Sequence, residues 1–181
     1  MTFALSACTT EEPSSTEPTT SEQQEPAEEF NDADVEFTTG MIPHHQQAIV
    51  MSEMAVDQGG PEVADLAERI EAAQDPEIDT MRAWLQDWGV DVPTGMGDMG
   101  DMGDMGMMSP GEMQDMMEAE GDQFDTIWLE MMIEHHEGAI SMSRAQQDEG
   151  LNPDAVALAG TIIEAQQSEI DEMEQMLGSG Q

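Results

Sequence analysis

The segment MIPHHQQAIVM, residues 41–51, decides the fold because the chain contains a second copy of it, MIEHHEGAISM, at residues 132–142. Together the two copies hold all four histidines of the 181-residue chain. An aspartate and an aromatic residue precede each copy at the same spacing, and residues 66–85 are repeated as residues 158–177. Self-similarity over such a length indicates an internal duplication of a unit of about 55 residues.

Each repeated unit has the pattern of two helices. Apolar residues recur every three or four positions, as in Leu66, Ile70 and Ala73, and no alternation of period two is visible. Glycine followed by proline interrupts each unit, at residues 59–61 and 150–153, which is typical of one helix ending and the next beginning. The sequence therefore predicts four helices, and they are expected over residues 31–58, 61–88, 122–149 and 153–177.

The four predicted helices form two hairpins, and neither hairpin alone could bury its apolar face. Short connections make the two helices of a hairpin antiparallel neighbours. We therefore predict an all-α fold, a ferritin-like four-helix bundle in which the two duplicated hairpins pack about a pseudo-twofold axis. Asn152 is a predicted N-cap, and Ser109 with Glu112 predicts a short additional helix over residues 110–119.

The chain divides into three regions. Residues 1–8 have the pattern of the end of a lipoprotein signal, with small residues before Cys8, the only cysteine and the predicted lipidation site. Residues 9–29 are rich in Thr, Ser, Glu and Pro and are predicted to be a disordered acidic stalk. The predicted bundle occupies residues 30–178, and it comprises hairpin one at 30–88, a methionine- and glycine-rich loop at 89–110 and hairpin two at 111–178.

The charge of the chain excludes several classes of partner. There are 41 acidic residues, three arginines and no lysine, which gives a net charge of −38. Nucleic acids and anionic membrane surfaces both attract basic residues, so neither is an expected partner. No apolar run is long enough to span a membrane, so a lipid on Cys8 is the only membrane attachment expected. These features predict an extracytoplasmic protein, in the cell envelope or secreted, whose partners are metal ions.

The histidines lie on the face of each hairpin's first helix that is predicted to be buried. At about 100° per residue, an arc of about 120° collects five residues of the first copy and the five matching residues of the second. They are Met41, His44, His45, Ala48 and Met51, and Met132, His135, His136, Ala139 and Met142. Burying four imidazoles is costly unless each has a partner, so we predict a metal site, with a metal-free hydrogen-bonded network as the alternative. The second helices offer acceptors that could orient the imidazoles, namely Gln74, Glu77, Gln166 and Glu169.

The methionines favour copper over iron or zinc as the metal. Di-iron bundles use Glu-x-x-His, whereas this chain places Met41 one turn before His44 and Met132 one turn before His135. Thioether and imidazole ligands suit copper, while zinc takes cysteine, histidine and carboxylate. Nine of the 19 methionines lie between residues 96 and 117, where we expect a mobile loop that captures Cu(I). Its candidate ligands are Met96, Met99, Met102, Met105, Met107 and Met108.

The segments GMIPHHQQAIVM and FDTIWLEMMIEHHEGAISM resemble the signature of the domain of unknown function 305 family, and the resemblance covers residues 30–178. It implies a ferritin-like four-helix bundle, often duplicated, in secreted or lipid-anchored bacterial proteins, some of which are linked to periplasmic copper binding. The family usually has proline, as at Pro43, where the second copy has Glu134, so we expect altered helix geometry and unequal copper affinity in the two halves. The resemblance marks as candidate metal ligands Met41, His44, His45, Met51, Met132, His135, His136 and Met142.

The leading functional prediction is an extracytoplasmic protein that sequesters or transfers Cu(I) or Cu(II). One alternative is a ferritin-like oxidase acting on copper or iron, for which Glu77 and Glu169 would supply carboxylates. Another is a non-metal interaction module that uses its acidic face and its histidines. No Ser-His-Asp, Cys-His or phosphate-binding motif is visible, so enzymatic function is not favoured. The oligomeric state, including a homo-oligomer, is left open.

Overall fold

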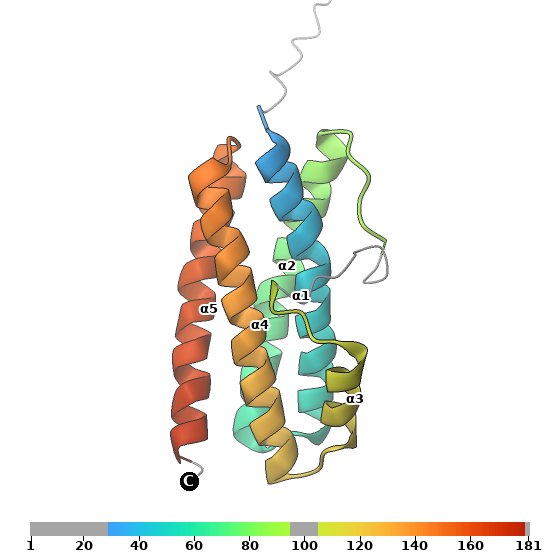
Figure 1. Ribbon diagram of the computed structural model, residues 1–181, viewed down its shortest axis with the longest axis vertical. Coiled ribbons are helices and arrows are strands. Elements are labelled where there is room, and N and C mark those ends of the chain that lie inside the picture. The colour runs from blue at the N-terminus through green and yellow to red at the C-terminus, as the bar shows by residue number, and fades with distance from the viewer. Residues whose placement is uncertain (1–28, 95–104, 180–181) are drawn as a thin grey trace, which may run out of the picture.

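The computed structural model describes residues 29–94 and 105–179, and within these ranges the regular elements are all helices (Figure 1). The all-α prediction is therefore confirmed, and each long helix begins and ends within two residues of its predicted bounds. The predicted signal, almost all of the predicted stalk, and Met96, Met99 and Met102 lie outside the described residues. In chain order the helices are α1 (Asp32–Gln58), α2 (Pro61–Asp87), α3 (Pro110–Glu118), α4 (Asp122–Glu149) and α5 (Pro153–Ser179).

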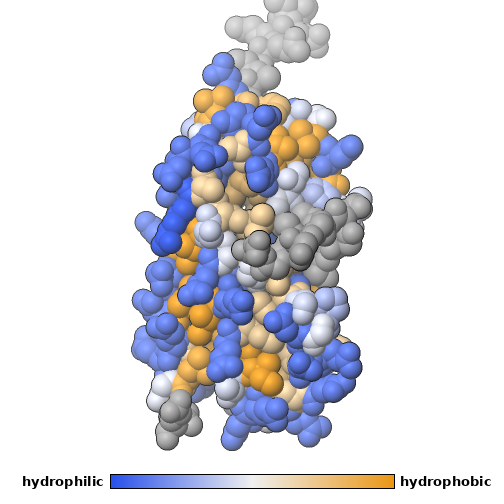
Figure 2. All heavy atoms as spheres, in the orientation of Figure 1, coloured by the Kyte–Doolittle hydropathy of each residue, from blue (hydrophilic) through white to orange (hydrophobic). Residues whose placement is uncertain are grey.

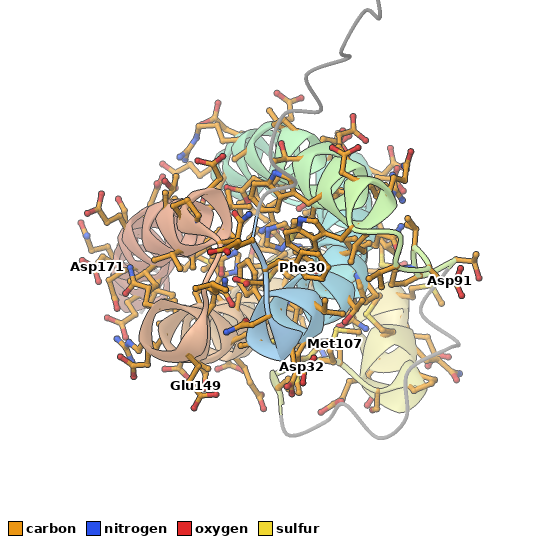
Figure 3. All side chains as sticks on the ribbon, turned by 90° about the horizontal axis from the view of Figure 1, so that it is seen from above. Phe30, Asp32, Asp91, Met107, Glu149 and Asp171 are labelled. Atoms are coloured by element: carbon orange, nitrogen blue, oxygen red, sulfur yellow. The ribbon has the colours of Figure 1, made fainter. Side chains whose placement is uncertain are left out.

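The four long helices form two antiparallel hairpins, α1 with α2 and α4 with α5, which pack together mainly through α1 and α4. A long connection leads from the end of α2 to the opposite end of the bundle, so α2 and α4 run in the same direction (Figure 1). Two hairpins joined by one long crossover give the ferritin-like topology that the sequence predicted. The short helix α3 contacts α4 and lies outside the four-helix core (Figure 3).

Hydrogen bonds at the helix starts explain why the helices begin where they do. The Asn31 side chain accepts a hydrogen bond from the Asp34 N–H, and the Asp34 carboxylate accepts one from the Asn31 N–H. Ser109 and Glu112 form the predicted capping box in the same reciprocal way. The Asn152 side-chain oxygen accepts from the N–H groups two and three residues ahead, as predicted for an N-cap.

Two duplicated aspartates fasten each hairpin to the turn of the other. Asp34 is fully buried at the start of α1 and accepts hydrogen bonds of 3.0 to 3.2 Å from the N–H groups of Leu151 and Asn152, in the α4–α5 turn. Asp125, at the start of α4, accepts a 2.8 Å hydrogen bond from the N–H of Gly60, in the α1–α2 turn. This exchange follows the pseudo-twofold relation of the hairpins and gives a structural reason for the repeated aspartate.

The apolar core consists of two clusters, one toward each end of the bundle. The lower core cluster, near the α1–α2 turn in Figure 1, includes Phe124, Trp128, Met51, Met132 and Met173. The upper core cluster, near the α4–α5 turn, includes Phe37, Met41, Met81, Leu85 and Ala159. Along α1 the two histidines fall between Met41 of the upper cluster and Ala48 of the lower one. The level of the bundle that holds His44, His45, His135 and His136 is called the histidine layer below.

The face seen in Figure 2 is largely hydrophilic, with apolar patches between the helices. The Arg69 guanidinium links the two hairpins by donating to both carboxylate oxygens of Glu172, at 3.1 and 2.6 Å. Both side chains are exposed, so water screens this pair and its contribution to stability is small. Among the described residues, no helix is both long and apolar enough to cross a membrane.

Candidate metal centre

His44 of α1 and His135 of α4 meet at the middle of the bundle. Their ring centroids lie 3.7 Å apart with the planes tilted by 41°, and both side chains are fully buried. The two residues hold matching positions in the two similar sequence segments. Two of the predicted ligands therefore meet at one point, where α1 and α4 pack.

His45 and His136 lie against carboxylates of the second helix of their own hairpins. The Nε2 atom of His45 lies 2.7 Å from Glu77 Oε2, and Nε2 of His136 lies 2.7 Å from Glu169 Oε2. Both histidines are fully buried, while the glutamates keep a small exposed fraction. In metal proteins a carboxylate commonly orients a ligating imidazole in this way, with the other ring nitrogen directed at the metal.

The ring nitrogens show which atoms remain free to act as ligands. Nε2 of His44 donates to the carbonyl oxygen of Met105 at 3.0 Å, and in neutral imidazoles Nε2 of His45 and His136 donates to glutamate. A neutral ring that donates through Nε2 keeps its lone pair on Nδ1. All three Nδ1 atoms, and both nitrogens of His135, are buried without a hydrogen-bond partner. Leaving such atoms unpaired costs about 1–3 kcal/mol each.

Burial also keeps the central pair of imidazoles uncharged. Desolvation, followed by the charge of His45, lowers the pKa of His44 from 6.5 to about 3, although the hydrogen bond to Met105 opposes the shift. Desolvation, followed by the charges of the other histidines, lowers the pKa of His135 well below its ordinary value of 6.5. Both rings are therefore neutral near pH 7 and can offer lone pairs to a cation.

The predicted methionine ligands belong to two different core clusters. Met41 belongs to the upper core cluster with Met142 packed against it, whereas Met51 and Met132 belong to the lower core cluster. Met41 and Met51 share a face of α1, but ten positions separate them, which is about 15 Å along a helix. The duplicated thioethers instead form an upper group of Met41, Met81 and Met142 and a lower group of Met132, Met173 and Met51.

Gln74 and Gln166, like Glu77 and Glu169, are predicted to accept hydrogen bonds from the imidazoles. Of these four described side chains, only Glu77 and Glu169 do so. Both glutamines are about 2 to 3% exposed, and neither the oxygen nor the nitrogen of either carboxamide has a partner. Within residues 29–94 and 105–179, no three His, Cys, Asp or Glu side chains are arranged to hold one metal ion. A metal bound here would therefore take thioether ligands or require the side chains to move.

The sequence predicts a difference in helix geometry between Pro43 and Glu134. In the structure α1 continues through Pro43 and α4 continues through Glu134 without a break.

Residues 105–108, here called the strap, contact the histidine layer, and no pattern in the sequence predicted this contact. Besides the Met105 carbonyl on His44, the Gln47 carboxamide donates to the Met108 carbonyl at 2.8 Å and accepts from the Met108 N–H at 2.7 Å. Gly138 of α4 makes room for the strap, because a Cβ atom there would collide with the Met105 backbone. Met108 is buried in the core, whereas Met105 and Met107 are partly exposed.

Comparison with known proteins places these features in a family. A family model described as a domain of unknown function, DUF305, matches residues 34–177. No functionally curated protein matches the chain. A DUF305 fragment from Deinococcus radiodurans is 29% identical with a TM-score of 0.75, covering 82% of this chain and 97% of its own. A DUF305 protein from Streptomyces coelicolor, assigned as secreted, is 29% identical with a TM-score of 0.72, covering 81% and 93%.

Solved structures of CopM with bound metal are also similar to this chain. CopM in its Cu(II)-bound form is 32% identical with a TM-score of 0.71, covering 82% of this chain and 97% of CopM. The Cu(I)-bound form gives 30% identity and a TM-score of 0.68, covering 81% and 96%. CopM has also been solved with silver bound. The likeness therefore extends to a protein whose structures contain copper in both oxidation states.

Proposed function

This chain belongs to the DUF305 family, and from that premise we propose that it is an extracytoplasmic copper-binding protein. It sequesters copper or transfers it to another carrier, and the buried histidine layer is its tight site. The observation that carries the proposal is the set of unpartnered buried nitrogens on four duplicated histidines, two of which are oriented by carboxylates. The similarity to CopM supports the choice of copper.

The oxidation state follows from the ligands that the layer offers. The carboxylates of Glu77 and Glu169 are hydrogen-bonded to Nε2 atoms, so the other side chains near the imidazoles that could bind a metal are the thioethers of the two methionine groups. Thioethers are soft ligands that prefer Cu(I), and they carry no proton that a metal must displace. Cu(I) is therefore the form we expect at the histidine layer, reached from Cu(II) only in the presence of a reductant.

Two segments outside the four long helices, the methionine-rich loop and the segment around Cys8, also enter the proposal. We propose that the loop methionines Met96, Met99, Met102, Met105 and Met107 bind Cu(I) weakly and raise its local concentration. We also propose that Cys8 carries a lipid that holds the chain in the cell envelope. Metabolic labelling with a fatty-acid analogue would test the second point, since a Cys8→Ser variant should lose the label.

A competition titration tests the central proposal. Metal-free protein is titrated with Cu(I) in the presence of a coloured Cu(I) chelator of known affinity. The wild type should compete with a dissociation constant well below about 1 μM, and an H44Q/H135Q variant should lose this tight binding. A variant with Met96, Met99 and Met102 changed to leucine should keep it. Tight binding that survives in the histidine variant would show that His44 and His135 do not form the tight site.

A metal oxidase is the second candidate, because the two His–Glu pairs place carboxylates beside imidazoles. Such an enzyme needs carboxylate ligands and an open coordination position. In the structure the glutamates are hydrogen-bonded to Nε2 atoms, which favours an orienting role over a ligating one. Oxygen consumption by the protein with Cu(I) or Fe(II) distinguishes the two, since a storage or transfer protein should not accelerate it.

A further inference from the structure

A cavity of about 410 Å³ lies between the first half of α1 and the second half of α4. Its lining includes Phe37 and Gly40 from α1, Met142 and Gln146 from α4, and Met105 from the strap. Met105 is also the residue whose carbonyl oxygen accepts the hydrogen bond from His44. The strap residue that holds a central histidine is therefore part of the cavity lining.

The matching position in the other repeated segment, between the first half of α4 and the second half of α1, carries larger side chains. The residue that corresponds to Gly40 in the second hairpin is Met131, and it packs against the lower core cluster. Trp128 corresponds to Phe37, and Met51 corresponds to Met142. The indole N–H of Trp128 donates to the carbonyl oxygen of Met51, and the side chain of Met51 is fully buried. The matching position is thus filled by side chains, while Gly40 leaves its own side open.

The lining offers the ligand atoms that a soft cation needs. Met105 and Met142 are partly exposed, unlike the fully buried Met41, Met51 and Met132. The Sδ atom of Met142 lies 3.6 Å from where a Cβ atom on Gly40 would be. Gln146 is 1% exposed, and its side-chain oxygen has no hydrogen-bond partner.

We propose that this cavity is a transit site through which Cu(I) reaches the histidine layer. The ion binds the thioethers of Met105 and Met142, with the free oxygen of Gln146 close by, and passes to the lone pair on Nδ1 of His44 when the strap moves aside. Exposed Glu36 and Glu149 also line the cavity, and their charge raises the local concentration of cations. This inference rests on the proposed copper-binding function and adds to it a route of entry.

The test measures the rate of loading separately from the affinity. Full-length, metal-free protein is mixed in a stopped-flow instrument with the Cu(I) complex of a coloured chelator, and loss of colour reports transfer. Gly40→Leu should fill the cavity and slow loading by about tenfold or more, because entry would then require the helices to move. Its equilibrium affinity for Cu(I) should stay within about twofold of the wild type. Gly178→Leu is the control, since nothing lies within 4 Å of an added Cβ there.

A second variant and a spectroscopic measurement test the route even if Gly40→Leu does not fold. Met105→Leu leaves the cavity walls in place but removes one thioether, and it should also slow loading. In protein labelled with ¹³C at the methionine methyl groups, substoichiometric Ag(I) should shift the Met105 and Met142 signals before those of Met41 and Met132.

The outcomes separate the two proposals. A wild type that binds no Cu(I) would remove the proposed function itself. A wild type that binds, with Gly40→Leu and Met105→Leu loading at its rate, would leave the function standing and overturn the route. Early Ag(I) shifts at the buried methionines instead of Met105 and Met142 would overturn it as well.

Discussion

Glu77 Oε2 lies 2.7 Å from Nε2 of His45, and the duplicated pair, Glu169 and His136, repeats the contact at the same distance. Each contact joins the two helices of one hairpin, so it is built within a single repeat. The carboxylate fixes the ring orientation and, in the neutral ring, leaves the lone pair on Nδ1, which has no partner in the folded chain. The repeat therefore carries an oriented imidazole as part of its own structure.

The first prediction concerns this orientation. Glu77→Gln keeps the shape of the side chain but removes the charge, and its amide can present either a donor or an acceptor to His45. We expect Cu(I) affinity to fall by about 10-fold or more, as observed when residues that orient metal ligands are changed. Competition titration measures this, and Glu68→Gln, an exposed change on the same helix, serves as the control. Unchanged affinity in Glu77→Gln would show that the charge of the Glu77 carboxylate is not needed to orient His45.

The second prediction concerns pH. The pKa of His44 is about 3 in the folded chain against 6.5 as its ordinary value, so between these limits the unfolded chain binds a proton that the folded chain excludes. Folding stability is then complete above pH 6.5 and falls as the pH drops, by about 1.4 kcal/mol per pH unit for this group. The lowered pKa of His135 adds a loss of the same sign.

Denaturant unfolding of the metal-free protein at pH 7.5, 6 and 5 measures this loss. The carboxylates of the chain also respond to acid, so the comparison is made with H44Q/H135Q, which keeps them all. The variant should lose less stability than the wild type over the same interval. Equal slopes would mean that the two histidines are not the groups that resist protonation.

The positions of the helices could be predicted because local signals set them. Gly59 and Pro61 end one helix and begin the next, and Asn152 caps α5 with its own side chain, so each boundary depends on a few neighbouring residues. The central pair, His44 and His135, could be anticipated from the duplication, because a residue near a pseudo-twofold axis meets its own counterpart.

The rest of the site depends on distances that the sequence does not express. Met41 and Met51 share a face of α1 but lie in different core clusters, because an angular pattern says nothing of separation along the helix. The contact of Met105 with His44 depends on the path of the crossover, which no periodicity encodes. The close approach of Gly106 to Gly138 was not predicted either, although glycine is often needed where two backbones pass close to each other.

The third prediction compares the two duplicated aspartates. Asp34 accepts hydrogen bonds from the N–H groups of Asn31, Leu151 and Asn152 and from the Gln146 carboxamide, so Asp34→Ala leaves several buried donors unpaired. We expect a loss of about 3 kcal/mol in the free energy of unfolding. Asp125→Ala removes the bond to Gly60 and should cost only about 1 kcal/mol. Denaturant unfolding at pH 7.5 measures both, and equal losses would contradict the unequal burial of the two carboxylates.

The fourth prediction tests the strap through Gly138. Alanine normally stabilises a helix relative to glycine, by up to about 1 kcal/mol. At position 138 the added Cβ atom would collide with the Met105 backbone, so we expect Gly138→Ala to destabilise the protein by about 1–3 kcal/mol instead. Gly178→Ala, where nothing lies near the added atom, should show the ordinary neutral or stabilising effect.

Displacement of the strap should also be visible at His44. In ¹⁵N-labelled protein, the Nε2–H of His44 is buried and hydrogen-bonded to the Met105 carbonyl, so its proton should exchange slowly with water. Gly138→Ala should speed that exchange, because the acceptor moves away and water reaches the ring. If the signal persists and stability rises as it does for Gly178→Ala, then the strap does not press on Gly138 and His44 is held by another group.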